Sequence, residues 1–175
     1  MGRRSRDGGA AATPAIAALR AAGIAHDVHT YDATSRDYGG EAARAMSEKL
    51  GVDPARVFKT LVLATTRPPA GSRVPLAVAI LPVISTLDLK AAASALGCGK
   101  ASLATVEATE KSTGYVIGGV SPVGQKRSLV TIVDATALDH PTILCSAGRR
   151  GWEIELTGPD LVAVTRAVVA PIATS

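Results

Sequence analysis

The sequence predicts an α+β domain with a mixed, strongly curved sheet. Strand-like and helix-like segments follow one another without the regular alternation of a doubly wound fold. Apolar residues make up 47% of the 175 residues and aromatic residues only 3%, so Ala, Val, Leu and Ile must build the core. The sequence has no internal repeat and no long linker. We therefore expect a single domain over residues 13–175, preceded by a disordered extension over residues 1–12.

Capping residues mark the expected helices. In chain order, these helices cover residues 13–22, 41–50, 88–96, 105–111 and 157–168. The first begins where the N-cap Thr13 precedes a proline, and the third where Thr86 or Asp88 supplies a side-chain oxygen. Thr105 and Thr157 begin the last two helices. A glycine follows each of the first three helices and ends it by taking the left-handed conformation.

Apolar runs and alternation mark the expected strands. In chain order, these strands cover residues 24–31, 57–64, 75–82, 101–103, 129–133, 142–146 and 152–156. The run over residues 57–64 is apolar on both faces, which is typical of a central strand. The run over residues 152–156 alternates as a half-buried strand does. We expect the tail after residue 168 to fray.

Composition and charge exclude several classes of protein. Cys98 and Cys145 stand far apart, and the chain has neither a CxxC motif nor a Cys/His cluster with zinc spacing, so we expect no metal and no cofactor. A reducing cytoplasm fits this cysteine usage best. No apolar run reaches the roughly 18 residues of a membrane span, and no signal-peptide core follows the basic start. The net charge of +4 is compatible with an anionic partner but does not require one.

A glycine-rich loop, GGVSPVGQKR, occupies residues 118–127 between two strand-like runs. Glycine permits positive φ and lets a ligand come close to the main chain. Successive N–H groups in such a turn can form a nest that binds an anion, and Lys126 adds positive charge at the exit of the loop. Two interpretations stay open: the loop holds an oxyanion, a phosphate or a ribose edge, or it only turns the chain.

Lys59 is the single residue that most strongly suggests a functional site, because it is a charge on an apolar strand face. In an extended strand it shares a face with Val57 and Leu61, and full burial of an unpaired ammonium is costly. Either the amine meets a partner or a ligand, or the side chain snorkels to the end of the strand.

Other polar residues carry weaker signals. Ser121 could be a nucleophile only with a base within reach, and no histidine lies in a recognisable motif. His29 is expected to be structural, and Glu153 and Glu155 to share a solvated strand face. The Arg149–Arg150 pair could contact phosphates from an exposed turn. Without a clear nucleophile or a nucleotide-binding motif, the inventory suits a pocket that orients an anionic or ester substrate through backbone N–H groups.

A series of short motifs follows in a fixed order. The motifs are TPA at residues 13–15, HTY at 29–31, YG at 38–39, VFKTL at 57–61, LDLK at 87–90, STGY at 112–115, GGVSPVGQK at 118–126, RG at 150–151 and IEL at 154–156. Together they resemble the YbaK/EbsC family of the bacterial Cys-tRNA(Pro) deacylase type. The resemblance covers residues 13–170, and its specific part is the lysine strand combined with the GGxSPxGQK loop.

This resemblance implies a single-domain editing hydrolase, acting in trans, that removes a wrong amino acid from mischarged tRNA(Pro), with prolyl-tRNA synthetase as a partner. It implies a sheet curled into a partial barrel and flanked by helices. The family's essential lysine falls on Lys59 and the first glycine of its loop on Gly118. Expected substrate contacts are Tyr31, Thr60, Gly119, Ser121 and Ser146, and expected tRNA contacts are Lys126, Arg149 and Arg150.

The resemblance also implies substrate-assisted chemistry, in which the cysteine thiol, or a ribose hydroxyl with water, attacks the ester. Lys59 would contact the terminal nucleotide or the aminoacyl group, and N–H groups near Gly118 would stabilise the oxyanion. Two alternatives stay open: a deacylase for Ala-tRNA(Pro) or another small amino acid, and a non-catalytic module that binds tRNA or the synthetase.

Overall fold

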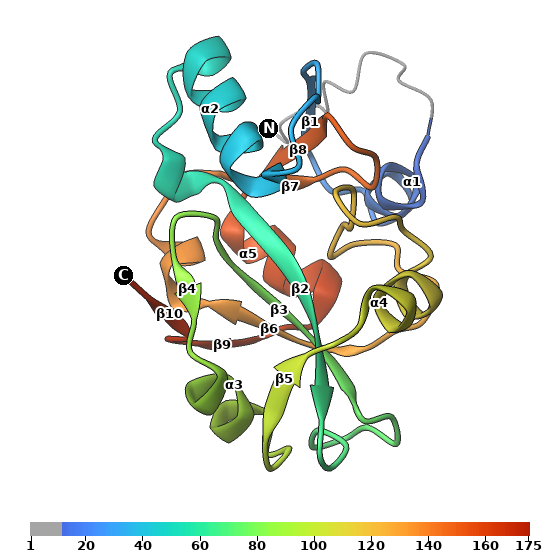
Figure 1. Ribbon diagram of the computed structural model, residues 1–175. Coiled ribbons are helices and arrows are strands. Elements are labelled where there is room, and N and C mark those ends of the chain that lie inside the picture. The colour runs from blue at the N-terminus through green and yellow to red at the C-terminus, as the bar shows by residue number, and fades with distance from the viewer. Residues whose placement is uncertain (1–11) are drawn as a thin grey trace.

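The computed structural model describes residues 12–175, and Figure 1 shows it as a ribbon. The expected extension over residues 1–12 lies outside the described residues, except for Ala12. The described chain combines α-helices with a mixed sheet, so the predicted α+β class is confirmed.

The larger sheet has five strands and contains the central strand that the sequence predicted. In spatial order the strands are β5 (Ala101–Leu103), β2 (Phe58–Thr65), β3 (Leu76–Pro82), β6 (Val130–Asp134) and β9 (Val168–Ala170). β2 runs antiparallel to both of its neighbours, whereas β6 runs parallel to β3 and to β9. The long apolar runs therefore form β2 and β3, which have neighbours on both sides.

The smaller sheet is antiparallel and meets the larger sheet at one point. In spatial order its strands are β1 (Asp27–Thr30), β8 (Trp152–Leu156) and β7 (Ile143–Ser146). A parallel bridge joins Val57, just before β2, to Leu144 of β7. The two sheets thus continue into each other without closing into a full barrel. A separate pair consists of β4 (Thr86–Leu87) and β10 (Ala173–Thr174).

The helices begin at side-chain caps. The α-helices are α1 (Pro14–Ala21), α2 (Tyr38–Leu50), α3 (Leu89–Leu96), α4 (Val106–Thr113) and α5 (Gly158–Thr165), and the 3-10 helices are η1 (Pro54–Arg56) and η2 (Ala135–Leu138). The predicted caps Thr13, Asp88, Thr105 and Thr157 all accept hydrogen bonds from the first turn. α2 begins before the predicted residue 41, because Asp37 caps it. Even α2, the longest helix described at 13 residues, falls short of a membrane span.

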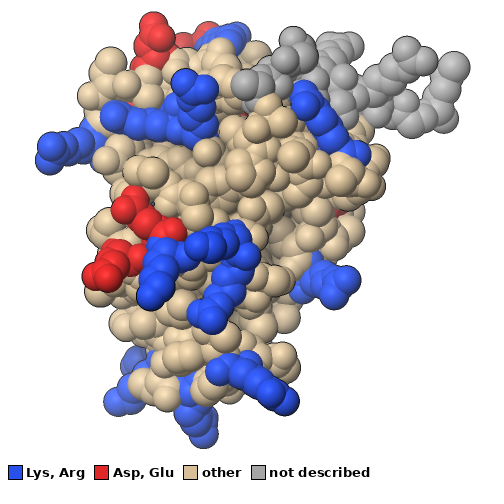
Figure 2. Space-filling model, turned by 90° about the vertical axis from the view of Figure 1, so that its right-hand side faces the viewer, with Lys and Arg blue, Asp and Glu red and all other residues tan. Residues whose placement is uncertain are grey.

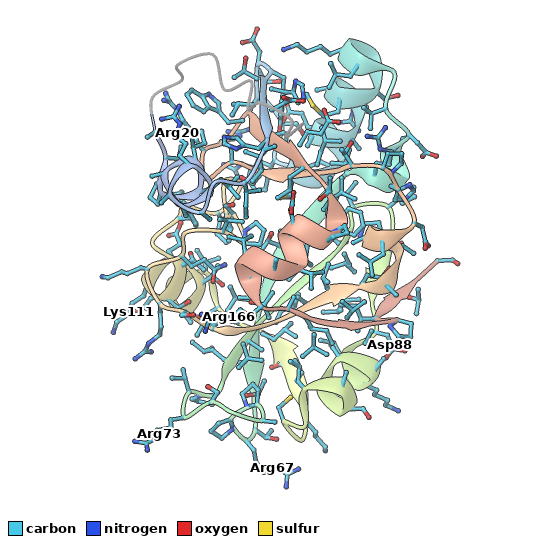
Figure 3. The ribbon with its side chains drawn as sticks, turned by 180° about the vertical axis from the view of Figure 1, so that it is seen from behind. Arg20, Arg67, Arg73, Asp88, Lys111 and Arg166 are labelled. Carbon is cyan, nitrogen blue, oxygen red and sulfur yellow. The ribbon has the colours of Figure 1, made fainter. Side chains whose placement is uncertain are left out.

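Alternate residues of the larger sheet face two cores. Val62 and Val78 belong to the main core, which also contains residues of α1 and α5, whereas Leu63 and Ala77 pack against residues of α3. Figure 1 shows α5 behind the larger sheet, and Figure 3, seen from the opposite side, shows it in front. A third cluster joins α2 to the point where Val57 bridges to the smaller sheet. This cluster fixes α2 above the junction of the two sheets.

The C-terminal segment differs from the prediction. α5 ends at Thr165 and not near residue 168, because Arg166 takes a left-handed conformation with a φ of 54°. The residues after the helix do not fray but pair as β9 and β10. The prediction failed because two very short strands carry too little alternation to be recognised.

Asp134 fastens this C-terminal segment to the sheet. One carboxylate oxygen accepts hydrogen bonds from the N–H groups of Ile172 at 2.9 Å and Ala173 at 3.0 Å. Burial alone would raise the pKa of Asp134, but the hydrogen bonds from Thr136, Ile172 and Ala173 outweigh it and hold that pKa below its ordinary value.

Asp134→Ala should lower the free energy of unfolding by roughly 1–3 kcal/mol, because the N–H groups of Ile172 and Ala173 lose their acceptor. Hydrogen exchange should accelerate at those two amides and stay slow in β2 and β3. Asp139→Ala, at an exposed position just after η2, is the control. Unchanged exchange at Ile172 would show that the carboxylate does not hold the segment.

Candidate functional site

A pocket of about 330 Å³ lies between the start of α2, β2, α4 and the glycine-rich loop. Both sheets contribute to its walls, since β2 belongs to the larger sheet and β7 and β8 to the smaller. A volume of this size lies in the range of small-molecule sites. Five of the predicted site residues line the pocket: Tyr31, Lys59, Thr60, Gly118 and Ser146.

Lys59 is half-buried in the pocket wall. Its amine donates a hydrogen bond to the carbonyl oxygen of Ser85 at 2.7 Å, so the amine meets a partner. Burial lowers the pKa of Lys59. No carboxylate of residues 12–175 pairs with this ammonium, so its charge is not neutralised within the described chain.

The glycine-rich loop leaves main-chain donors unpaired at the pocket wall. The N–H groups of Gly118 and Val120 donate to no described residue, and both residues line the pocket. Gly118 has a φ of 93°, and a Cβ at this position would lie 2.9 Å from the ring of Tyr38. Glycine is therefore required at position 118 both by the backbone conformation and by the close approach of the ring.

Five residues with a hydroxyl group line the same pocket, and three of them, Tyr31, Thr60 and Ser146, are predicted substrate contacts. Burial, followed by the negative charge of Glu153, raises the pKa of Tyr31 to about 12, so its phenol stays protonated. The buried hydroxyl of Thr60 has no hydrogen-bond partner in the described part of the chain. The hydroxyl of Ser146 accepts a hydrogen bond from the N–H of Gly148 at 3.2 Å. No described histidine lines the pocket, so none of these hydroxyls has a histidine base there.

Glu153 corrects a prediction. It does share a strand face with Glu155, but the Glu153 side chain is buried and borders the pocket, whereas Glu155 is partly exposed. Glu153 is only 6% exposed, and burial raises the pKa of its carboxyl to about 8. The carboxylate of Glu155 already has a partner in His29, whose Nε2 lies 2.9 Å from one of the carboxylate oxygens. The carboxyl of Glu153, by contrast, has no hydrogen bond or ion pair with any residue of the described chain.

Two predicted substrate contacts lie outside the pocket lining. The N–H of Gly119 donates to the carbonyl oxygen of Val116 at 2.9 Å, and a Cβ on Gly119 would lie 2.8 Å from the main-chain nitrogen of Arg150. Ser121 is fully buried, and its hydroxyl accepts a hydrogen bond from the N–H of Val123 at 3.3 Å. Both residues thus shape the loop from behind the pocket wall.

The predicted tRNA contacts also lie outside the lining, in different surroundings. Lys126 is exposed and makes no ion pair with a described residue. The guanidinium of Arg149 lies 5.0 Å from the centroid of the Trp152 ring. The guanidinium of Arg150 lies 5.2 Å from the centroid of the Tyr38 ring.

Arg150 supports the wall of the pocket. Besides contacting Tyr38, it donates a hydrogen bond to the carbonyl oxygen of Ser35 and lies 3.9 Å from the carboxylate of Glu41. The ring of Tyr38 in turn lies so close to Gly118 that a Cβ there would be 2.9 Å from it. The start of α2 is therefore tied to the glycine-rich loop through one arginine and one aromatic ring.

Among the pocket residues that the sequence did not indicate are Arg36, Tyr38 and Glu153. Arg36 is exposed, lines the pocket and makes no ion pair with residues 12–175. The arginine in a polar loop just before a helix could have indicated a site for an anion. Tyr38 belongs to the YG motif, which by itself indicates no pocket, and nothing in the alternation of β8 shows that the face of Glu153 points inward.

Asp27, His29 and Glu155 could hold a metal, since ligand atoms of all three lie within 4.8 Å of one another. However, the carboxylate of Glu155 already accepts hydrogen bonds from His29 and from Thr142 and lies 3.5 Å from the guanidinium of Arg56. These contacts account for the cluster as a structural link between β1, β8 and η1, with His29 in the structural role that the sequence predicted.

The two cysteines offer no nucleophile to the pocket. Cys98 and Cys145 are free and fully buried, and neither lines the pocket. Burial, together with the nearby charge of Glu153, raises the pKa of the Cys145 thiol well above its ordinary value.

Comparison with known proteins identifies the family. Residues 39–164 match the family model of the aminoacyl-tRNA editing domain. The chain belongs to this family. The matched part of the editing domain includes most of the pocket wall, among it Lys59, Gly118 and Glu153.

Relatives of the editing domain include one, EbsC, of the YbaK/EbsC type that the motifs resemble. EbsC of Enterococcus faecalis, named as a proposed Cys-tRNA(Pro)/Cys-tRNA(Cys) deacylase, is 35% identical over 133 residues, which cover 76% of this chain and 77% of EbsC. The solved structure of a proposed trans-editing enzyme for prolyl-tRNA synthetase is 25% identical with a TM-score of 0.78, covering 93% of this chain and 96% of that one. The hypothetical protein APE2540 has the same fold, with a TM-score of 0.77 at 24% identity over 93% of this chain and all of that one.

Glu153→Gln should make the editing domain more resistant to unfolding at alkaline pH. The pKa of Glu153 is about 8 in the folded chain against 4.5 ordinarily, so the folded state holds the proton more tightly and wild-type stability falls as pH rises between these values. The stability gain of the variant should therefore grow by up to roughly 1.4 kcal/mol per pH unit and level off above pH about 8.

Urea unfolding at several pH values between about 5 and 9 measures this difference. Glu107→Gln, at an exposed position of α4, is the matched control and should follow the wild type at every pH. Parallel stability curves for Glu153→Gln and the wild type would show that Glu153 is not a buried, uncompensated carboxyl.

Proposed function

We propose that this editing domain is an aminoacyl-tRNA deacylase that removes cysteine from mischarged tRNA(Pro). The observation that carries the proposal is the shared pocket of the Lys59 amine and the unpaired N–H groups of Gly118 and Val120. An ester carbonyl in this pocket would find donors for its developing negative charge. The relative EbsC, named for Cys-tRNA(Pro) and Cys-tRNA(Cys), supports this choice of substrate.

Each group of the pocket has a role in this proposal. The N–H groups of Gly118 and Val120 stabilise the oxyanion, and the Lys59 ammonium contacts the terminal nucleotide or the aminoacyl group. The hydroxyls of Tyr31 and Thr60 orient the ribose and the amino acid, and so does that of Ser146. Gly119 and Ser121 act indirectly, by holding the loop in the shape that leaves those N–H groups unpaired.

The nucleophile in this proposal comes from the substrate or from water, because the described pocket wall includes no cysteine, and no histidine that could activate one of its hydroxyls. In the first route the cysteine thiol attacks its own ester carbonyl, a C–S bond forms, the ester C–O bond breaks, and the thiol proton ends on the ribose oxygen. In the second route a ribose hydroxyl positions water, and free cysteine is released. Product analysis separates a cyclic thioester from free cysteine.

Docking of the tRNA is proposed to use phosphate contacts around the pocket. Arg36 at the pocket and Lys126 near the end of the glycine-rich loop are exposed cations without an ion-pair partner in the described chain. Figure 2 shows Lys and Arg side chains spread from top to bottom of the face beside α1 and α4. Figure 3 places Arg20, Lys111 and Arg73 along this same side of the molecule. We propose that the editing domain receives tRNA(Pro) in the cytoplasm from prolyl-tRNA synthetase, and that residues 13–175 suffice for the reaction.

Lys59→Ala and Gly118→Ala should each lower the rate of Cys-tRNA(Pro) deacylation by roughly 10²–10³-fold, because one removes the unneutralised cation and the other displaces the loop against Tyr38. Single-turnover deacylation of Cys-tRNA(Pro) measures the loss. Lys90→Ala removes an exposed lysine, and Gly71→Ala adds a Cβ at a φ of 80° where nothing lies within 4 Å.

These two controls should keep wild-type rates, although Gly71→Ala carries similar backbone strain. Equal losses in Gly71→Ala and Gly118→Ala would assign the effect to backbone strain alone. Parallel assays on Ala- and Ser-charged tRNA(Pro) identify the amino acid that is removed, since a hydrophobic pocket separates such substrates by only about 1–3 kcal/mol per methylene. Turnover of none of the three would leave the non-catalytic module as the function.

Lys126→Ala should weaken tRNA(Pro) binding and reduce the slope of log affinity against log salt by roughly one, as expected for one lost phosphate contact. Filter binding between about 50 and 200 mM salt measures the slope. Arg149→Ala should change it less, because that guanidinium already lies on the Trp152 ring. An affinity of wild-type protein that does not depend on salt would contradict phosphate docking.

A further inference from the structure

The proposed substrates carry a positive charge, and the N–H donors that would stabilise the oxyanion cannot bind it. Every aminoacyl ester carries an α-ammonium group on the carbon next to the scissile carbonyl. When this group enters a pocket it loses water, and a desolvated charge is costly unless an acceptor or an opposite charge replaces that water. The pocket must therefore contain a partner for a cation as well as donors for an anion.

Only two acidic side chains line the described pocket wall, Asp37 and Glu153. Asp37 is exposed and already engaged, since it accepts a hydrogen bond from the N–H of Gly40 and lies 3.6 Å from the guanidinium of Arg44. Glu153 is buried, and within residues 12–175 nothing donates a hydrogen bond to its carboxyl. Of the two, Glu153 alone is both shielded from water and free to accept.

The neighbours of Glu153 leave its charge uncompensated. Tyr31 and Cys145 are near enough to interact with it electrostatically, but both remain neutral. The directly opposite positions are His29 on β1, which bonds Glu155, and Ser146 on β7. Lys59 lines the same pocket, but its amine donates to the carbonyl oxygen of Ser85.

We propose that Glu153 binds the α-ammonium group of the aminoacyl ester, and that the editing domain therefore acts on free aminoacyl groups and spares N-acylated ones such as peptidyl groups. This inference rests on the proposed deacylase function. Around pH 6 the empty pocket holds Glu153 as a neutral acid, because its pKa is about 8. Binding of an ammonium favours the carboxylate, so the carboxyl releases its proton to solvent as the salt bridge forms.

The kinetic test compares Cys-tRNA(Pro) with N-acetyl-Cys-tRNA(Pro) on wild-type protein and Glu153→Gln. The variant should raise KM for Cys-tRNA(Pro) by roughly 10- to 100-fold, the range of a lost charge-assisted hydrogen bond, with a small change in kcat. It should treat N-acetyl-Cys-tRNA(Pro) as the wild type does. Equal losses on both substrates would assign Glu153 a structural role and overturn the proposal, as would no loss on either. Glu107→Gln is the control for the substitution itself.

A binding test decides the inference without turnover, so that failure of the deacylase function is distinguishable from failure of the ammonium site. The probe is 3′-cysteinylamino-3′-deoxyadenosine, whose amide resists cleavage, together with its N-acetyl derivative. Calorimetry at pH about 6 in two buffers of different ionisation enthalpy should give release of close to one proton on wild-type protein. It should give none on Glu153→Gln and none for the N-acetyl probe. Binding of the free-amine probe to wild-type protein without proton release, or no binding of it at all, would overturn the proposal.

Discussion

The pocket depends on how the two sheets meet at the bridge between Val57 and Leu144. Two residues beyond this bridge, β2 presents Lys59, and two residues beyond it, β7 presents Ser146. The next strand, β8, carries Glu153 opposite Ser146. A cation from one sheet and a carboxyl from the other thus line one cavity near the point where this bridge joins the sheets. The apolar cluster of α2 covers this junction and fixes it.

Several polar groups around this junction lack partners that folding alone would supply. The hydroxyl of Thr60 and the N–H groups of Gly118 and Val120 make no hydrogen bond within the described chain, and Glu153 is buried without a counter-charge. Unpaired buried groups reduce stability, and folded proteins satisfy most of them. Their concentration in one pocket, beside a lysine of lowered pKa, is typical of a site whose missing partners belong to a ligand.

The fold was largely predictable, because capping residues and long apolar runs are local signals. Thr13, Asp88 and Thr105 cap helices as expected, and the apolar run of β2 is central. Lys59 could be singled out because a charge on an apolar strand face conflicts with burial. Glu153 could not, since alternation tells which residues share a face and not which face points inward. The pairing that turns this face toward the pocket joins β8 to β1, which lies more than a hundred residues earlier in the chain.

The same limit applies to the basic residues. The sequence placed Arg149 and Arg150 in an exposed turn that could contact phosphates, but it did not show that each guanidinium lies against an aromatic ring. Arg150 reaches Tyr38 only because β8 lies beside β1 and α2 packs over both sheets. Short strands such as β9 and β10 escape detection for a related reason, since they depend on Asp134 and on neighbouring strands more than on their own residues.

The unpaired N–H groups of the glycine-rich loop have an evolutionary consequence. Every residue except proline has a main-chain N–H group. An oxyanion site built from such groups is therefore retained when side chains are replaced at Val120 or in the apolar wall formed by Phe58 and Val62. The main-chain groups that would stabilise the transition state are thereby distinct from the side chains that would contact the aminoacyl side chain and select it by size. Preference for one small amino acid over another could drift by a few substitutions while the chemistry is inherited unchanged.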